Sequence, residues 1–179
     1  MSDKAMIIEP LDTARHERAA FMSGIAQVDN YLRKTASKLD RADNVRAFVL
    51  LSPDQVLMGF YTLNAHSVDF SHLPASYVRN RPGHGQIPAA FISMIGVDAR
   101  FQGRGLGSLL LADALKRIGR AARDVGIAIV LLDILNCGDQ DLVERRKQLY
   151  MRYGFQPLPD FPLRLFLPVA KIHALLGLA

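Results

Sequence analysis

The stretch Gln102-Gly103-Arg104-Gly105-Leu106-Gly107 decides the fold of this chain. It follows residues 91–97, an apolar run that predicts a buried strand. Behind it, apolar side chains recur at the spacing of an amphipathic helix, at Leu111, Leu115, Ile118, Ala122 and Val125. Glycine allows a backbone to come close to a ligand, and the amides at the start of a helix suit a diphosphate. The stretch therefore predicts a phosphate-binding loop, in which Arg104 adds a positive charge.

Two other phosphate-binding loops do not fit this pattern. A Rossmann site needs G-x-G-x-x-G and an acidic residue at the end of the next strand. Here the third position is Ser108 or Leu110, and Asp133 lies inside the next apolar run. A Walker loop needs Gly-Lys-Ser/Thr, which is absent. A tight turn that binds nothing would require neither three glycines nor an arginine at a helix start.

The rest of the chain predicts a mixed α/β fold in a single domain, residues 1–179. Strands are expected at residues 6–9, 46–51, 56–64, 91–97, 127–135 and 161–169, with residues 52–55 as the turn of an antiparallel hairpin. Helices are expected at residues 14–21, 28–41 and 141–153, and another follows the glycine loop. Asp12 or Thr13 would cap the first of these helices, and a left-handed Gly126 would end the one behind the glycine loop. Residues 67–88 are expected to form a long irregular connection.

Composition limits the class of protein. Twenty-two Lys and Arg against seventeen Asp and Glu give a net charge of +5, which favours a phosphate-rich ligand or nucleic acid, although a solvated basic surface explains it equally well. The lone Cys137 excludes an internal disulfide, and we expect a structural cysteine. We find no signal-peptide pattern and no apolar run long enough to span a bilayer. These features predict a cytoplasmic protein without a membrane anchor.

Two motifs resemble those of the GNAT acetyltransferases. The acetyl-CoA motif of that family, Gln/Arg-x-x-Gly-x-Gly/Ala, is matched by Gln102, Gly105 and Gly107, and its second motif by Tyr150-Met151-Arg152-Tyr153-Gly154-Phe155. The chain is most similar to the GNAT toxins of toxin–antitoxin pairs, at residues 21–36, 59–63, 87–88, 96–98 and 110–115. It departs from them at Met94-Ile95-Gly96-Val97-Asp98, where those toxins usually read Arg-Leu-Ala-Val-Asp, and in a longer segment at residues 136–147.

The resemblance implies a GNAT fold, a mixed central sheet flanked by helices, with acetyl-CoA as co-substrate and no metal. It assigns coenzyme binding to Ile95, Val97, Gln102, Gly103, Arg104, Gly105, Leu106, Gly107 and Ser108. The amide near Val97 would polarise the acetyl carbonyl, and the amine would attack directly. Tyr150 would hydrogen-bond the departing sulfur; the alternative is that Tyr150 packs in the core, a role we expect instead for Tyr153. A homodimer and a ribbon-helix-helix antitoxin are implied as partners.

The supply of bases favours an α-amino acceptor. The only glutamates are Glu9, Glu17 and Glu144, none of them beside the strand at residues 91–97, which leaves Asp98 as the nearby carboxylate. An α-amine with a pKa of about 7.7 to 8.0 is neutral about a tenth of the time at pH 7, whereas a lysine amine near 10.4 almost never is. An enzyme without a strong base therefore suits an α-amine better than a lysine side chain.

These observations lead to one main function and two alternatives. The main prediction is a toxin that acetylates the α-amine of aminoacyl-tRNA. The alternatives are housekeeping acetylation of a small amine, antibiotic or protein N-terminus, and a CoA-binding module without chemistry. A phosphate-binding surface for tRNA could be formed by Arg33, Lys34, Lys38, Arg41, Arg79, Arg81, Arg145, Arg146 and Lys147, although scattered solvated charges explain them as well. We interpret His66, His72 and His84 as polar loop residues, because they lack metal-ligand spacing.

Overall fold

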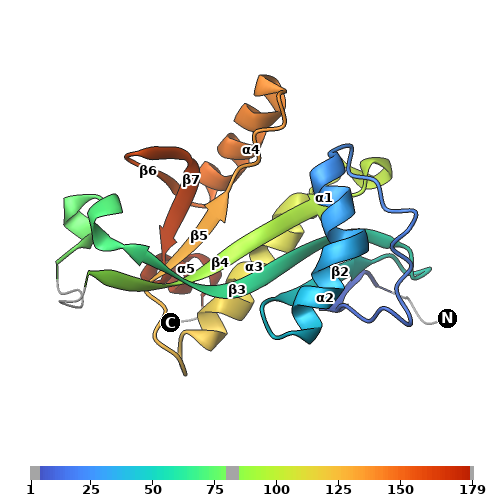
Figure 1. Cartoon of the computed structure of the whole chain (residues 1–179), viewed down its shortest axis with the longest axis horizontal. Coiled ribbons are helices and arrows are strands. Elements are labelled where there is room, and N and C mark those ends of the chain that lie inside the picture. Colours follow the sequence, from blue (N-terminus) through green and yellow to red (C-terminus); the bar gives the residue numbers. More distant parts are fainter. Residues whose placement is uncertain (1–4, 80–84, 178–179) are drawn as a thin grey trace. The chain divides into compact units, whose positions relative to one another are not determined.

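A computed structural model of the chain describes residues 5–79 and 85–177. The strands form a mixed sheet in the order β1-β2-β3-β4-β5-β7-β6 (Figure 1). The chain groups into two compact units, Met1–Asn64 with Ser93–Ala114 and Ala65–Ile92 with Leu115–Ala179. Strands β3 (Leu57–Asp69) and β4 (Gln86–Val97) and helix α3 (Leu106–Ala121) each run from one unit into the other. The predicted mixed α/β class is confirmed, and the single domain stays a prediction.

The first unit holds an antiparallel arrangement of β1 (Ile7–Pro10), β2 (Arg46–Leu51) and the first part of β3. The hairpin between β2 and β3 is as predicted, with Gln55 in the left-handed region of its turn (φ 64°). The predicted helix at residues 28–41 is present as α1 (Ala26–Asn30), a π-helical segment (Tyr31–Thr35) and α2 (Ala36–Arg41). Its apolar positions Leu32 and Ala36 are fully buried, as their spacing indicated.

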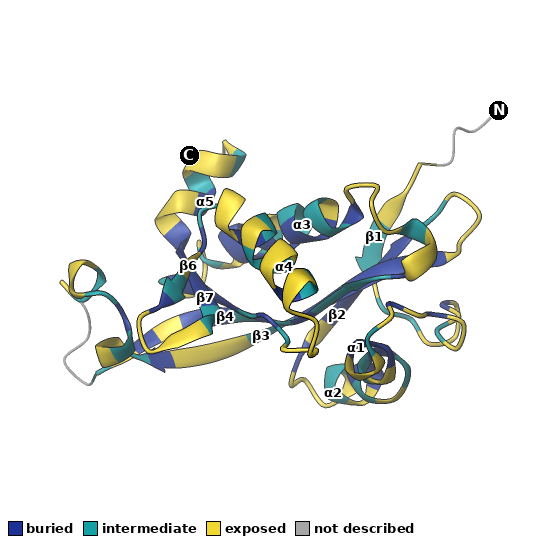
Figure 2. Ribbon diagram, turned by 90° about the horizontal axis from the view of Figure 1, so that it is seen from above, coloured by how far each residue is buried: buried dark blue, intermediate teal, exposed yellow. Residues whose placement is uncertain are grey.

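Alternation along β3 decides which helix covers which face in this unit. Phe60 points toward the N-terminal segments, because its ring packs edge-to-face on Phe21 and stacks on Tyr31. Tyr61 points to the other face, where its hydroxyl donates a hydrogen bond to Asp113 of α3. Successive side chains of a strand face opposite sides, so β2 and β3 lie between α1 and α2 on one face and the start of α3 on the other (Figure 2).

The second unit is built around β5 (Ile129–Asp133), which is buried as predicted but shorter than the expected residues 127–135. It pairs in parallel with β4 and antiparallel with β7 (Phe161–Pro168), and β7 pairs with β6 (Gln156–Leu158). The unit also contains α4 (Gln140–Arg152), close to the predicted residues 141–153, and α5 (Val169–Leu176). A buried apolar cluster joins these strands: Val68, Leu73, Ile87, Ala89, Ile129, Leu131, Leu158 and Phe166. The sequence did not predict β6 or α5.

The helix predicted at residues 14–21 is wrong, because the structure has only turns there. The Asp12 carboxylate accepts a hydrogen bond from the amide of Ala14, as a cap would. The buried ring of His16, however, accepts the amide hydrogen of Asp12 at Nδ1 and bonds Glu9 through Nε2. Such side-chain bonds to a nearby backbone compete with helix formation.

Two further boundaries were wrong. Residues 67–88 are not one irregular connection, because β3 continues to Asp69 and β4 already begins at Gln86, with short 3₁₀ turns at Phe70–His72 and Ala75–Tyr77. Helix α3 ends at Ala121, earlier than predicted, so Val125 is exposed and Gly126 does not adopt a left-handed conformation. The side chains of Lys116, Arg120 and Arg123 are exposed.

Candidate functional site

The glycine loop has a backbone that only glycine adopts easily. Gly103 and Gly105 both have φ of 76°, in the left-handed region, where a residue with a Cβ atom costs about 1–2 kcal/mol. A Cβ atom added at either position would meet no heavy atom within 4 Å, so the space beside the loop is open. Gly107 differs, because it lies in the first turn of α3 without a positive φ. Backbone conformation rather than crowding therefore requires glycine at 103 and 105.

The loop leads directly into the N-terminus of α3. The amide of Leu109 donates to the Gly105 carbonyl at 3.1 Å, which closes the first turn of the helix. The amides of Leu106 and Gly107 come before Leu109 in the chain, in the first turn of α3, and an α-helix offers no internal acceptor to its first amides. With the positive end of the helix dipole behind them, such amides form an anion-binding site. The sequence predicted this arrangement from the position of the glycines between strand and helix.

Gln102 anchors the loop rather than extending from it. Its side-chain amide donates to the carbonyls of Ser23 at 2.8 Å and Val97 at 2.9 Å. The motif glutamine therefore ties the loop to the end of β4 and to the segment before α1. Arg104 is exposed, and its guanidinium lies over the Phe101 ring, 5.6 Å from the centroid. Arg104 thus keeps its charge in solvent beside the open side of the loop.

Asp98 is not placed to act as a base. The residue is almost completely buried and accepts hydrogen bonds from the amides of Met22 and Arg100 and from two nitrogens of the Arg100 guanidinium. Burial by itself would raise the pKa of Asp98, but the hydrogen bonds from Arg100 and Met22 outweigh burial and lower it. The carboxylate is therefore a fixed anchor for the turn after β4, and accepting a proton would cost it these bonds.

The second half of β4 lies beyond its pairing with β5. In the described part of the chain, the ladder between these strands runs from Ala89 and Ile129 to Ile92 and Leu132. The half-buried residues Ile95 and Val97 come after that point, and β4 continues to Val97. The edge of β4 that follows the ladder therefore has backbone groups that β5 does not pair. This is the edge along which the resemblance places the pantetheine arm.

Tyr150 lies on α4 in the second unit and is buried, only 5% exposed. Its ring packs edge-to-face on Phe155, with 6.3 Å between centroids. Tyr153 is half-buried, so our expectation that Tyr153 rather than Tyr150 would be the buried aromatic is wrong. Burial raises the pKa of Tyr150 to about 12, an effect that the charge of Arg146 partly opposes. The phenol therefore remains a neutral hydrogen-bond donor.

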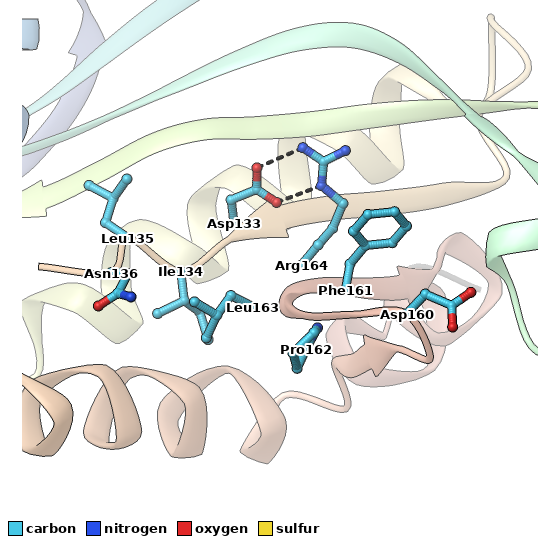
Figure 3. Close-up of a pocket in the computed structure, with 9 residues that line it drawn as sticks. All are labelled: Asp133, Ile134, Leu135, Asn136, Asp160, Phe161, Pro162, Leu163 and Arg164. Atoms are coloured by element: carbon cyan, nitrogen blue, oxygen red, sulfur yellow. Dashed lines mark hydrogen bonds and ion pairs between the residues drawn. The ribbon is translucent and has the colours of Figure 1, made fainter. Parts of the chain in front are cut away.

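A cavity of about 580 Å³ opens at the carboxyl end of β5 (Figure 3). Its lining is mainly apolar, with Ile134, Leu135, Phe161, Pro162 and Leu163 beside Asp133, Asn136, Asp160 and Arg164. This volume falls in the range of about 300–1,000 Å³ that is typical of small-molecule sites. Ligands commonly bind outside the carboxyl ends of parallel strands, and β5 pairs in parallel with β4. The cavity is thus a second candidate site, in the same unit as Tyr150.

Two of the three charged residues that line this cavity, Asp133 and Arg164, neutralise each other, and Asp160 is the third. Arg164 donates two hydrogen bonds to the Asp133 carboxylate, each at 2.7 Å, and Figure 3 shows the two side chains pointing toward one another. The guanidinium also lies over the Phe91 ring, 5.6 Å from its centroid. Sequence reasoning missed this pair. The feature of the sequence that could have revealed the pair is Asp133, the only charged residue within the apolar run at residues 127–135. Its partner could not be identified, because Arg164 lies 31 positions away.

The remaining predictions concern the histidines, the lone cysteine and metal ligands. The His66 ring of β3 lies against the Phe91 ring of β4, with 5.4 Å between centroids, and His72 packs edge-to-face on Phe161, so neither is a free loop residue. Cys137 is exposed, so the expected structural cysteine is wrong. His84 and Arg81 lie outside the described residues. Among the residues that the structure describes, no three His, Cys, Asp or Glu side chains are grouped so that they could hold a metal ion.

Residues 12–155 match the sequence profile of the Acetyltransferase (GNAT) family. The chain belongs to the GNAT family. One GNAT relative, a probable toxin TacT of Sinorhizobium fredii (strain NBRC 101917 / NGR234), is 56% identical over 172 residues, 96% of this chain and 95% of the relative. Another, a tRNA-acetylating toxin of Mycobacterium tuberculosis (strain ATCC 25618 / H37Rv), is 34% identical over 158 residues, 88% of this chain and 89% of the relative.

Solved structures of GNAT proteins show the same fold. AtaT complexed with acetyl-methionyl-tRNAfMet superimposes with a TM-score of 0.82 at 25% identity, covering 95% of this chain and 98% of that one. AtaTR bound with AcCoA gives a TM-score of 0.79 at 26% identity, covering 96% and 98%. The GNAT fold predicted from the two motifs is confirmed. No helix within residues 5–79 and 85–177 is both long and apolar enough to cross a membrane.

Proposed function

We propose that this GNAT protein transfers acetyl from acetyl-CoA to the α-amino group of aminoacyl-tRNA and so blocks translation. The observation that supports coenzyme binding is the left-handed pair Gly103 and Gly105, which opens the loop at the N-terminus of α3. In the described structure, a Cβ atom added at either glycine would meet no heavy atom within 4 Å beyond the adjacent residues, so the residues present fit a diphosphate. The similarity to a tRNA-acetylating toxin and to AtaT bound to an acetylated aminoacyl-tRNA supports the choice of acceptor.

The coenzyme would be held mainly by backbone groups. Acetyl-CoA supplies an activated acetyl thioester when it is bound. The amides of Leu106 and Gly107 hold its diphosphate, with Gly103, Arg104, Gly105 and Ser108 completing the loop and Gln102 fixing its position. The unpaired edge of β4 at Ile95 and Val97 hydrogen-bonds the pantetheine arm, and the Val97 amide donates to the acetyl carbonyl. A donor fixed at a developing oxyanion is a large catalytic contribution.

Tyr150 would act on the leaving sulfur as a hydrogen-bond donor. The acceptor amine forms a C–N bond to the acetyl carbon, the C–S bond breaks, and the amine proton passes to solvent. With a pKa of about 12 against about 8.5 for a thiol, full proton transfer from Tyr150 to the thiolate would be uphill by about 5 kcal/mol. The neutral phenol therefore stabilises the thiolate through a hydrogen bond, and the thiolate takes its proton from water.

The carboxylates near β4 in the described structure are already engaged, which supports an α-amino acceptor. Asp98 is buried and committed to Met22 and Arg100, and its pKa is lowered, while Asp133 of β5 is paired with Arg164. An amine that is already neutral in a useful fraction at pH 7 needs no such base, and an α-amine meets that condition while a lysine amine does not. The exposed basic residues Lys34, Lys38 and Arg41 of the π-helical segment and α2 can contact the tRNA backbone.

The cavity at the end of β5 is a suitable place for the aminoacyl side chain. Its apolar walls favour an apolar group, the Asp133–Arg164 pair is neutral, and the exposed Asp160 leaves one negative charge that repels an acidic side chain. We therefore expect apolar amino acids to be preferred and acidic ones to be disfavoured. The proposal also includes a ribbon-helix-helix antitoxin and a homodimer. It includes a cytoplasmic location, because charged tRNA is a cytoplasmic substrate.

The test is direct acetylation of charged tRNA. Purified protein is incubated with acetyl-CoA and a panel of aminoacyl-tRNAs, and the N-acetylated amino acids are identified by mass spectrometry after deacylation. We expect acetylation of one or a few aminoacyl-tRNAs whose amino acid has an uncharged side chain. Acetylation of lysine side chains or small polyamines without any on charged tRNA would indicate the housekeeping enzyme. Binding of acetyl-CoA with no acceptor acetylated in any class would indicate a binding module and reject the proposal.

A further inference from the structure

A second cavity, of about 290 Å³, lies within the first unit, away from the glycine loop in the sequence. It is lined by Thr13, His16, Glu17, Arg18, Ala19 and Arg33. The segment at residues 13–19 forms one side, and the π-helical segment contributes Arg33. The volume is just below the range of about 300–1,000 Å³ that whole drug-sized ligands occupy, so a single small group fits it better than a cofactor.

The two arginines of this cavity lack carboxylate partners within the described part of the chain. The Nε atoms of Arg18 and Arg33 are buried and have no hydrogen-bond acceptor there. Each guanidinium makes one other bond, from Arg18 Nη1 to the Ser37 hydroxyl at 3.3 Å and from Arg33 Nη2 to the Phe21 carbonyl. A buried donor of a charged group without an acceptor is unfavourable. Arg18 and Arg33 are therefore charged groups whose hydrogen bonding the described structure leaves incomplete.

Two other polar side chains of the cavity, Glu17 and His16, are already engaged. The Glu17 carboxylate accepts the amide hydrogen of Ala19 at 2.6 Å and forms no ion pair with either arginine in the described structure. The ring of His16 uses both nitrogens, Nδ1 for the amide of Asp12 at 3.0 Å and Nε2 for Glu9 at 2.8 Å. The neighbouring Arg15 pairs with Glu9 at 2.9 Å, so it is neutralised where Arg18 and Arg33 are not. Among the described residues that line this cavity, the buried side-chain atoms without a hydrogen-bond partner thus belong to its two arginines.

We propose that Arg18 and Arg33 together bind a phosphate group of the nucleic-acid acceptor. A planar guanidinium with several N–H donors matches the oxygens of a phosphate, and two of them can hold one phosphate from two directions. Both residues are half-buried, so a phosphodiester at the surface can reach the part of each side chain that remains exposed. This inference rests on the proposed acetylation of charged tRNA and identifies residues that fix the position of that acceptor.

The experiment compares the variants Arg18→Gln and Arg33→Gln with Arg15→Gln, an exposed arginine of the same segment whose charge is already paired. Affinity for an aminoacyl-tRNA substrate is measured at several salt concentrations, together with KM and kcat for its acetylation. We expect each of the first two variants to raise KM about tenfold and to reduce the slope of log affinity against log salt by about one. Arg15→Gln should leave the slope within about 0.3 of wild type.

Three further measurements separate the possible causes. Thermal unfolding and acetyl-CoA binding show whether each variant is folded, and Arg18→Lys and Arg33→Lys replace any variant that is not. Inorganic phosphate should raise the Tm of the wild type more than that of the variants. The inference is rejected if the salt slopes are unchanged, if Arg15→Gln has the same effect, or if only acetyl-CoA binding weakens. If the wild type does not acetylate charged tRNA at all, the proposed function fails instead.

Discussion

Replacing Gly105 with alanine tests whether the left-handed backbone of the loop is needed for coenzyme binding. The residue has φ of 76°, and no heavy atom lies within 4 Å of the place where a Cβ atom would be. Steric overlap inside the protein is therefore absent, and the cost is conformational, about 1–2 kcal/mol for a residue with a Cβ. This cost must appear either in the stability of the free protein or in the affinity for acetyl-CoA.

The two outcomes have defined sizes. If the loop keeps its conformation, Gly105→Ala lowers the free energy of unfolding by about 1 kcal/mol, which shifts the Tm by about 2–4 °C in a chain of this length. If the loop relaxes instead, the coenzyme must restore it on binding, and the Kd for acetyl-CoA rises about tenfold for 1.4 kcal/mol. Thermal denaturation and isothermal calorimetry on the same preparation measure both contributions.

Two controls make the test specific. Gly126→Ala places the same methyl group at a glycine that has no positive φ and no close neighbour, so it should change neither quantity by more than about 0.5 kcal/mol. Gly105→Asn adds a larger side chain, but asparagine tolerates the left-handed region better, so it should cost less than alanine. An unchanged Tm together with an unchanged Kd for Gly105→Ala would refute the reasoning, as would an equal effect of Gly126→Ala.

Three further predictions concern residues around the site. Tyr150→Phe should lower kcat about 100-fold with an unchanged Kd for acetyl-CoA. Because burial raises the pKa of Tyr150 to about 12, kcat of the wild type should show no alkaline loss below about pH 11 in a pH–rate profile. Asp98→Asn should lower the free energy of unfolding by about 2 kcal/mol, because it weakens charge-assisted hydrogen bonds. Since the pKa of Asp98 is lowered in the folded state, the carboxylate stabilises the fold above about pH 4 and loses this effect in acid. Denaturation measured at several pH values checks both statements. Loss of a limb from the pH–rate profile of that variant would mean that Asp98 is a base after all. Gly96→Ala would place a Cβ atom 2.5 Å from Val28 Cγ1 and should cost about 1–3 kcal/mol in chemical denaturation, most of which Val28→Ala in the same chain should restore.

The parts of the site that depend on neighbouring residues could be predicted from the sequence. The glycines at 103 and 105, the strand before them and the helix after them are local patterns, because backbone dihedral preferences and helical periodicity act over a few residues. The same holds for the β2–β3 hairpin, whose turn is encoded in residues 52–55. These elements were expected and are present, and together they identify the family.

The failures came where burial and side-chain partners decide the outcome. Residues 14–21 have turns instead of a helix because the buried His16 bonds both Asp12 and Glu9. Tyr150 is buried although its sequence neighbourhood favoured Tyr153. Which charges are paired, as for Asp133 with Arg164, depends on strand pairing that brings together residues 31 positions apart.

By itself the sequence determined that this chain is a GNAT protein with a glycine loop before a helix, because that loop is built from local conformational preferences written in consecutive residues. Only the tertiary structure decided that Gln102 anchors the loop, that Asp98 is already committed, and that Arg18 and Arg33 share a cavity in which, within the described residues, neither forms an ion pair. Burial, hydrogen-bond partners and charge compensation are properties of the surroundings of a residue in space, and residues far apart in the chain create those surroundings.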